Sequence, residues 1–144
     1  MLNIRSVNHI GIRIREKTRS IDFYRSLGFA YEHSDGFEQG HPIVMRHPSG
    51  VVLNLLGPAN GNFDTNILMD ANEKHTGITH FAMTVADLDD AKATLESKGI
   101  ALTGAFSFGG MSAVFIRDPD RNVIELDAYG ADCKTEMEQY AEHP

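Results

Sequence analysis

The sequence contains two copies of one pattern, separated by a constant offset of 71 residues. The segment around His9 (VNHIGIRI) returns around His80 (ITHFAMTV), and no insertion separates the matched positions that follow. Repetition at a fixed period means that one supersecondary unit is used twice, so both halves are expected to share one fold. Further pairs keep the same offset: Gly28-Phe29 with Gly99-Ile100, Pro48 with Pro119, and Asn54 with Glu125.

Each copy is predicted to fold as β-α-β-β-β, because segments with apolar alternation surround one segment with helical spacing. In the second copy Asp87 is a suitable helix N-cap, and Gly99 closes the helix as Gly28 does in the first. The predicted elements of the first copy are a strand at Val7–Ile14, a helix at Thr18–Leu27 and strands at Phe29–His33, Pro42–His47 and Val51–Leu56. Those of the second are a strand at Ile78–Val85, a helix at 88–98 and strands at Ile100–Phe106, Ser112–Arg117 and Val123–Tyr129.

This pattern predicts an α+β protein. A chain of 144 residues is expected to form one domain, because it can bury a hydrophobic core without stabilising disulfides or metal ions. Module one covers about residues 7–56 and module two about residues 78–129. A connector rich in Gly, Asn and Asp joins them at 57–77, and a polar tail follows at 130–144, with a short helix expected at Glu136–Tyr140.

The composition excludes several kinds of partner. A net charge of −7 disfavours binding to nucleic acids or anionic membranes, both of which require a basic surface. The sequence shows no run of 18 apolar residues and no charged segment followed by an apolar one, so neither a membrane span nor a signal peptide is expected. The single cysteine, Cys133, cannot form an internal disulfide, which is typical of a cytoplasmic protein.

The strand alternation places one set of polar residues on a shared face. In the repeat-related strands the apolar side chains fall where a helix would pack, which leaves His9, Asn54, His80 and Glu125 on the other side. A lone histidine is more simply explained as a hydrogen-bonded core or surface residue. That explanation suits the histidines without repeat symmetry, namely His33, His41, His47, His75 and His143.

The pair of histidines at equivalent positions favours a metal site. Two neutral imidazoles and a carboxylate are a ligand set for Fe(II), Mn(II), Ni(II) or Zn(II) that leaves positions open for substrate. Glu125 lies between Ile124 and Leu126, and a carboxylate in the middle of such a strand is costly to bury unless it is paired or bound to a metal. His9, His80 and Glu125 are therefore the predicted ligands, with Asn54 as a fourth candidate.

The two copies, with the openings VNHIGI and ITHFAM, the segment SIDFYRSLGF and the closing FIRDPDRNVIEL, resemble the vicinal-oxygen-chelate superfamily. This group contains glyoxalase I, bleomycin-resistance proteins and extradiol dioxygenases, and the resemblance covers about Val7–Tyr129. It implies an eight-stranded open cup around a divalent metal on the concave face, with ligands at the positions of His9, Asn54, His80 and Glu125.

The resemblance to single subfamilies is incomplete. Arg13 matches the arginine with which glyoxalase I grips a carboxylate of its substrate, but Asn54 stands where that enzyme has a carboxylate ligand. Extradiol dioxygenases use the two histidines and the last glutamate, and they place a tyrosine ten residues before that glutamate, where this chain has Phe115. Fosfomycin-modifying transferases use the same ligands, but have a threonine at the position of Gly11. Arg13 and Phe115 are the predicted substrate-binding residues, and no catalytic residue is assigned.

These features predict a metal-dependent, glyoxalase-like lyase or isomerase in which the metal acts as a Lewis acid on a small substrate with vicinal oxygens. Arg13 favours an anionic substrate, and we expect a homodimer. Two alternatives remain open: an extradiol-type ring-cleaving dioxygenase, and a metal-free drug-binding module like the bleomycin-resistance proteins.

Overall fold

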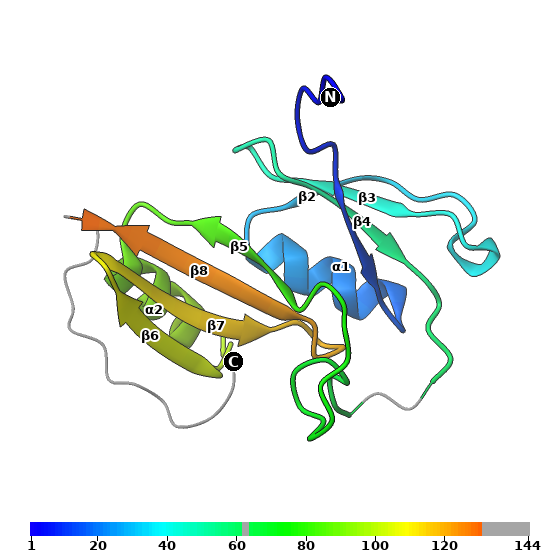
Figure 1. Cartoon of the computed structure of the whole chain (residues 1–144). Coiled ribbons are helices and arrows are strands. Elements are labelled where there is room, and N and C mark those ends of the chain that lie inside the picture. Colours follow the sequence, from blue (N-terminus) through cyan, green and yellow to red (C-terminus); the bar gives the residue numbers. More distant parts are fainter. Residues whose placement is uncertain (62–63, 131–144) are drawn as a thin grey trace. The chain divides into compact units, whose positions relative to one another are not determined.

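The computed structural model describes residues 1–61 and 64–130 of the chain. Its contacts define two compact units, Met1–Asn62 and Phe63–Pro144, whose boundary falls inside the expected connector. Each unit contains one copy of the repeat (Figure 1). Cys133, His143 and the tail helix expected at Glu136–Tyr140 lie outside the described residues.

The first unit contains one helix packed on one four-stranded sheet in its described part. The strand order is β1-β4-β3-β2, with β1 parallel to β4 and the other neighbours antiparallel. A 3₁₀ turn at Phe37–Gln39 connects β2 to β3. The elements are β1 (Ile10–Arg13), α1 (Lys17–Ser26), β2 (Ala30–His33), β3 (Ile43–Arg46) and β4 (Val52–Leu56).

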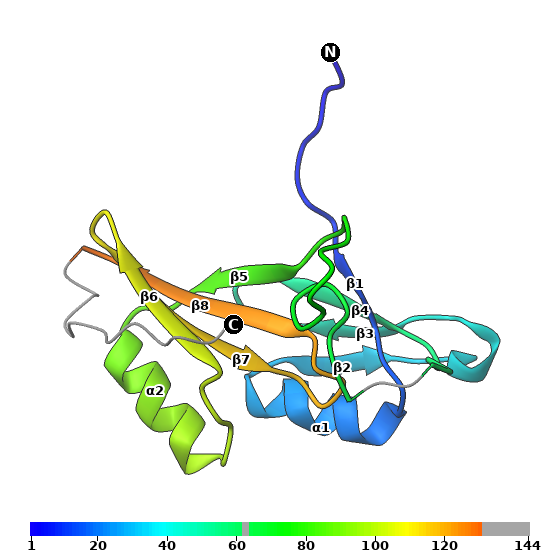
Figure 2. The ribbon, with the colours of Figure 1, turned by 60° about the horizontal axis from the view of Figure 1, so that its bottom comes forward.

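The second unit repeats this topology within residues 64–130, with the order β5-β8-β7-β6 and one parallel pair, β5 with β8. Helix α2 covers one face of this sheet (Figure 2). The elements are β5 (His80–Thr84), α2 (Leu88–Ser97), β6 (Gly104–Phe108), β7 (Met111–Arg117) and β8 (Val123–Tyr129). The predicted α+β fold of two βαβββ modules is thus confirmed.

The repeat extends to the ends of the helices. Helices α1 and α2 begin and end 71 residues apart. At the C-terminal ends, Gly28 (φ 97°) and Gly99 (φ 68°) take the left-handed conformation. The N–H of Phe29 then bonds to the carbonyl of Tyr24, as that of Ile100 does to Leu95, which completes a Schellman motif in each module.

The N-terminal caps also correspond. The Asp87 carboxylate accepts hydrogen bonds from the backbone N–H groups of Asp89 and Asp90, which confirms the predicted cap. Its counterpart is Glu16, whose carboxylate accepts from Thr18 and Arg19 at 2.9 and 2.8 Å. These bonds hold the pKa of Glu16 below its usual range.

Two predicted strands differ most from the observed ones. The strand expected at Ile100–Phe106 is displaced to Gly104–Phe108, because Gly109 and Gly110 (φ 59° and 79°) form a two-residue turn that pairs Phe108 with Met111. The strand expected at Val7–Ile14 is shortened to Ile10–Arg13, since its pairing with β4 begins at Ile10 opposite Leu53. His9 therefore lies just before β1.

The core follows the predicted alternation. In the first sheet Ile12, Leu53 and Leu55 are buried, whereas Gly11 and Arg13 are exposed. In the second sheet β8 is buried on both faces, because Glu125 (7% exposed) and Asp127 (6% exposed) are as inaccessible as Leu126 between them (7% exposed). No helix within the described residues is long and apolar enough to cross a membrane.

Candidate functional site

The face of the second sheet opposite α2 carries the polar residues that the alternation predicted. Side chains alternate along β8, so Glu125 and Asp127 lie on one face and Ile124, Leu126 and Ala128 on the other. The first face is the one that carries the exposed His80, Ala82 and Thr84 of β5, and the helix covers the second. Across the ladder, Ala82 of β5 lies opposite Glu125 on one side and Phe115 of β7 lies opposite it on the other.

His80 and Glu125 come together on this face. Nε2 of His80 lies 3.0 Å from Oε2 of Glu125, with the histidine side chain 35% and the glutamate side chain 10% exposed. Nδ1 of His80 is 2.9 Å from Oγ1 of Thr79. When Nδ1–H donates to this hydroxyl, Nε2 carries the lone pair, which is the form of imidazole that binds a metal.

Phe115 forms an aromatic wall beside this pair. Its ring meets the His80 ring edge-on at 5.9 Å between centroids, and it stacks with Phe106 at 5.8 Å. Phe115, a predicted substrate-binding residue, therefore lies beside His80 and Glu125, two of the predicted metal ligands. Phe106 was not among the predicted site residues, although it is an aromatic residue at the end of the strand expected at Ile100–Phe106.

The first unit presents the remaining predicted residues. His9 is exposed, and its Nδ1 lies 2.7 Å from Oδ1 of Asn8. Asn8 and Thr79 are 71 positions apart, so both histidines hydrogen-bond through Nδ1 to the side chain that precedes them. Asn54 is half-buried on β4 opposite Gly11, and Arg13 is exposed at the end of β1. Asn54 and Arg13 therefore lie on the face opposite to the buried Ile12, Leu53 and Leu55, and His9 immediately precedes β1.

The structure brings His80, Glu125 and Phe115 together within one unit, while His9, Asn54 and Arg13 belong to the other. Among residues 1–61 and 64–130, no three His, Cys, Asp or Glu side chains are grouped so that they could hold a metal ion. His80 and Glu125 are thus two of the three predicted metal ligands. The third, His9, is predicted from the repeat.

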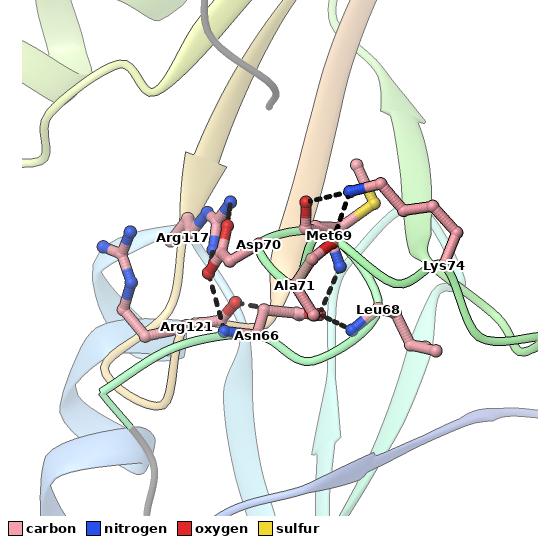
Figure 3. A network of polar contacts seen from close by, with 8 residues as sticks. All are labelled: Asn66, Leu68, Met69, Asp70, Ala71, Lys74, Arg117 and Arg121. Carbon is pink, nitrogen blue, oxygen red and sulfur yellow. Dashed lines mark hydrogen bonds and ion pairs between the residues drawn. The ribbon is translucent and has the colours of Figure 1, made fainter.

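An ion-pair network holds part of the expected connector against the second sheet (Figure 3). Arg117 donates two hydrogen bonds to Asp70, at 2.8 and 2.7 Å, and the Arg117 side chain is only 4% exposed. Asn66 donates from Nδ2 to the carbonyl of Arg121. Segment 64–77 therefore belongs to the second unit and lies at the end of β7 that follows Phe115.

Comparison with known proteins agrees with this architecture. The chain belongs to the Glyoxalase/Bleomycin resistance protein/Dioxygenase superfamily, whose family model matches residues 6–126. This superfamily includes enzymes and proteins that bind small molecules. The predicted resemblance is confirmed.

Particular relatives span most of the chain. A curated relative, the glyoxalase domain-containing protein RDO1 of Mycosarcoma maydis, is 28% identical over 136 residues, which cover 89% of this chain and 70% of that protein. A glyoxalase family protein from Enterococcus faecalis has a TM-score of 0.72 at 20% identity and covers 88% of this chain and 99% of its own.

Two further solved structures share the fold and differ in their described roles. A glyoxalase/dioxygenase from Nostoc punctiforme has a TM-score of 0.69 at 24% identity, covering 88% of this chain and 92% of its own. TnmS3, an antibiotic-binding protein from a Streptomyces species, has a TM-score of 0.68 at 18% identity, covering 90% and 100%. At these identities the likeness establishes the fold alone.

Proposed function

We propose that this protein is a divalent-metal-dependent enzyme of the superfamily, a glyoxalase-like lyase or isomerase that acts on a small substrate with two neighbouring oxygens. The observation that carries the proposal is the His80–Glu125 pair, with Nε2 and Oε2 3.0 Å apart on the face opposite α2. The Glu125 carboxylate is only 10% exposed and therefore requires a partner. With the imidazole of His80 beside it, it supplies two of the three ligands of a metal site.

His9 would supply the third ligand. Its hydrogen bond to Asn8 repeats that of His80 to Thr79, so each imidazole can donate through Nδ1 and keep its Nε2 lone pair available. A bound Fe(II), Ni(II), Mn(II) or Zn(II) ion would supply Lewis-acid chemistry to vicinal oxygens of the substrate. Phe115 and Phe106 would exclude water from one side of the substrate.

A ring-cleaving dioxygenase is the second candidate. The stacked Phe106 and Phe115 rings favour a planar ring as the ligand, because aromatic faces prefer offset stacking or edge contacts. A metal-free binding module is the third, and the shared fold with TnmS3 supports it.

Metal content separates the enzyme candidates from the binding module. We expect the purified full-length protein to bind close to one equivalent of Fe(II), Ni(II), Mn(II) or Zn(II) after reconstitution without oxygen, measured by elemental analysis after desalting. Substrate screens with hemithioacetals and with catechols, each with and without oxygen, then separate lyase from dioxygenase. A protein that retains none of the four metals would contradict the proposal and favour the binding module.

Asn54→Glu is expected to increase metal affinity about tenfold or more, because a charged carboxylate would replace a neutral amide at the fourth ligand position. Competition with a chelator measures the change. Asn60→Glu is the matched control, since it adds the same charge at an exposed position outside the strands. Equal affinities for Asn54→Glu and the unaltered protein would contradict the placement of Asn54.

Arg13→Met is expected to weaken binding of an anionic ligand about ten- to a hundredfold, because a charge-assisted contact is worth about 1.5–3 kcal/mol. Arg13 is exposed and lies along β1 from His9, about 13 Å further on. The probe is 3-(3,4-dihydroxyphenyl)propionate, compared with neutral 4-ethylcatechol by calorimetry. Arg5→Met serves as the control. Loss of metal or of folding in Arg13→Met would instead identify Arg13 as a structural residue.

A further inference from the structure

Asp127 is a buried carboxylate with an unmet hydrogen-bonding requirement. The residue is 6% exposed, and its Oδ1 atom is inaccessible to solvent and has no hydrogen-bond partner within the described residues. Burying an unpaired polar atom costs free energy, and a carboxylate costs more than a neutral group. Native structures therefore pair almost all such atoms, which makes an unpaired one a candidate for ligand contact.

The position of Asp127 links it to the candidate site. It follows Glu125 by two residues on β8, so both carboxylates share the face opposite α2, about 7 Å apart along the strand. Its neighbours across the ladders are Thr84 of β5 and Ala113 of β7. The row of polar positions therefore continues from His80 and Glu125 to Asp127.

The residues across the ladders from Glu125 and Asp127 on β5, Ala82 and Thr84, are small and exposed. Ala113 on the other side is small, so no long side chain from β7 occupies the space beside Asp127. The stacked Phe115 and Phe106 rings continue the same face.

We propose that Asp127, two residues along β8 from Glu125, binds a positively charged hydrogen-bond donor of the ligand, a primary ammonium group. A carboxylate in this setting is stabilised best by an opposite charge that also donates a hydrogen bond. The net charge of −7 also attracts a cation toward the protein. The inference rests on the proposed function, since it names a substrate class for the same site: an aromatic vicinal diol with an ammonium arm.

Matched probes test the role of Asp127. We expect the Zn(II)-loaded full-length protein to bind 3,4-dihydroxyphenethylamine about tenfold or more tightly than neutral 4-ethylcatechol, as measured by calorimetry. Asp127→Asn should remove this preference and leave the affinity for 4-ethylcatechol within about twofold. Equal affinities of the unaltered protein for the two probes would overturn the proposal, even if the variant failed to fold.

A second measurement separates this inference from the metal proposal. In the metal-free protein, phenethylamine should still bind more tightly than 2-phenylethanol, and Asp127→Asn should abolish the difference, followed by NMR chemical shifts. If 4-ethylcatechol binds equally with and without Zn(II) while this amine preference persists, the metal proposal fails and the role of Asp127 stands. If Asp127→Asn retains the amine preference, the Asp127 proposal fails.

Discussion

Replacing Asp70 with alanine is expected to destabilise the second unit by about 3 kcal/mol and to lower its melting temperature by roughly 12–24 °C. The change leaves the guanidinium of Arg117, which is 4% exposed, without its bidentate partner. Breaking a buried ion pair costs about 3–5 kcal/mol, and the lower end applies because the Asp70 side chain is 25% exposed. Urea unfolding followed by circular dichroism measures the effect.

Two variants control for the change of charge and of volume. Asp64→Ala removes a carboxylate from an exposed position of the same segment and should change stability by less than about 0.5 kcal/mol. The double variant Asp70→Leu/Arg117→Met should recover most of the loss, because neither charge is then left unpaired. A double variant as unstable as Asp70→Ala would show that packing of the segment, and not the ion pair, provides the stability.

The same ion pair should make stability depend on pH. The hydrogen bonds from Arg117 hold the pKa of Asp70 below its ordinary value of 3.8. A carboxyl group whose pKa is lower in the folded protein than in the unfolded protein stabilises the fold. This contribution is complete at pH values above the unfolded-state pKa, and it is lost as the pH falls through the folded-state pKa. The difference in stability between the unaltered protein and Asp70→Ala should therefore shrink as the pH falls below about 3.8.

Removing one predicted ligand is expected to reduce metal affinity at least about a hundredfold in His9→Ala, His80→Ala and Glu125→Gln alike. Loss of a hydrogen-bond partner behind a ligand already costs about 10–100-fold, so loss of the ligand itself should cost no less. Chelator competition with Zn(II) or Ni(II) measures the three affinities.

His75→Ala is the matched control for these variants. His75 lies in the second unit and its Nε2 is 3.8 Å from a carboxylate oxygen of Glu73, but it has no counterpart in the first copy. Its replacement should leave metal affinity unchanged. The decisive variant is His9→Ala, since His9 is assigned by the repeat alone. Unaltered metal affinity in that variant would refute the three-ligand site and restrict the metal hypothesis to His80 and Glu125.

The repeat made the architecture predictable because it fixed local structure in both halves at once. Both helices, their glycine ends and the cap at Asp87 depend on residues close in sequence, whose preferences act without the rest of the fold. Glu16 was missed as a cap because glutamate is not among the usual N-cap residues, although its counterpart is Asp87. The shift of β6 was also local, since the Gly109-Gly110 pair is a hairpin signal.

The sequence by itself determined which residues share a face, because side chains in a strand alternate between two sides whatever the strand pairs with. That rule, together with the repeat, selects His80 and Glu125, whose Nε2 and Oε2 atoms lie 3.0 Å apart in the structure. Tertiary structure alone decided what each residue meets on that face. The partner of Arg117 is Asp70, 47 residues away, and the ring beside Phe115 is set by the register of β6 with β7. That Oδ1 of Asp127 has no hydrogen-bond partner within the described residues has the same origin, because burial and hydrogen-bond partners depend on neighbouring strands that are distant in the chain.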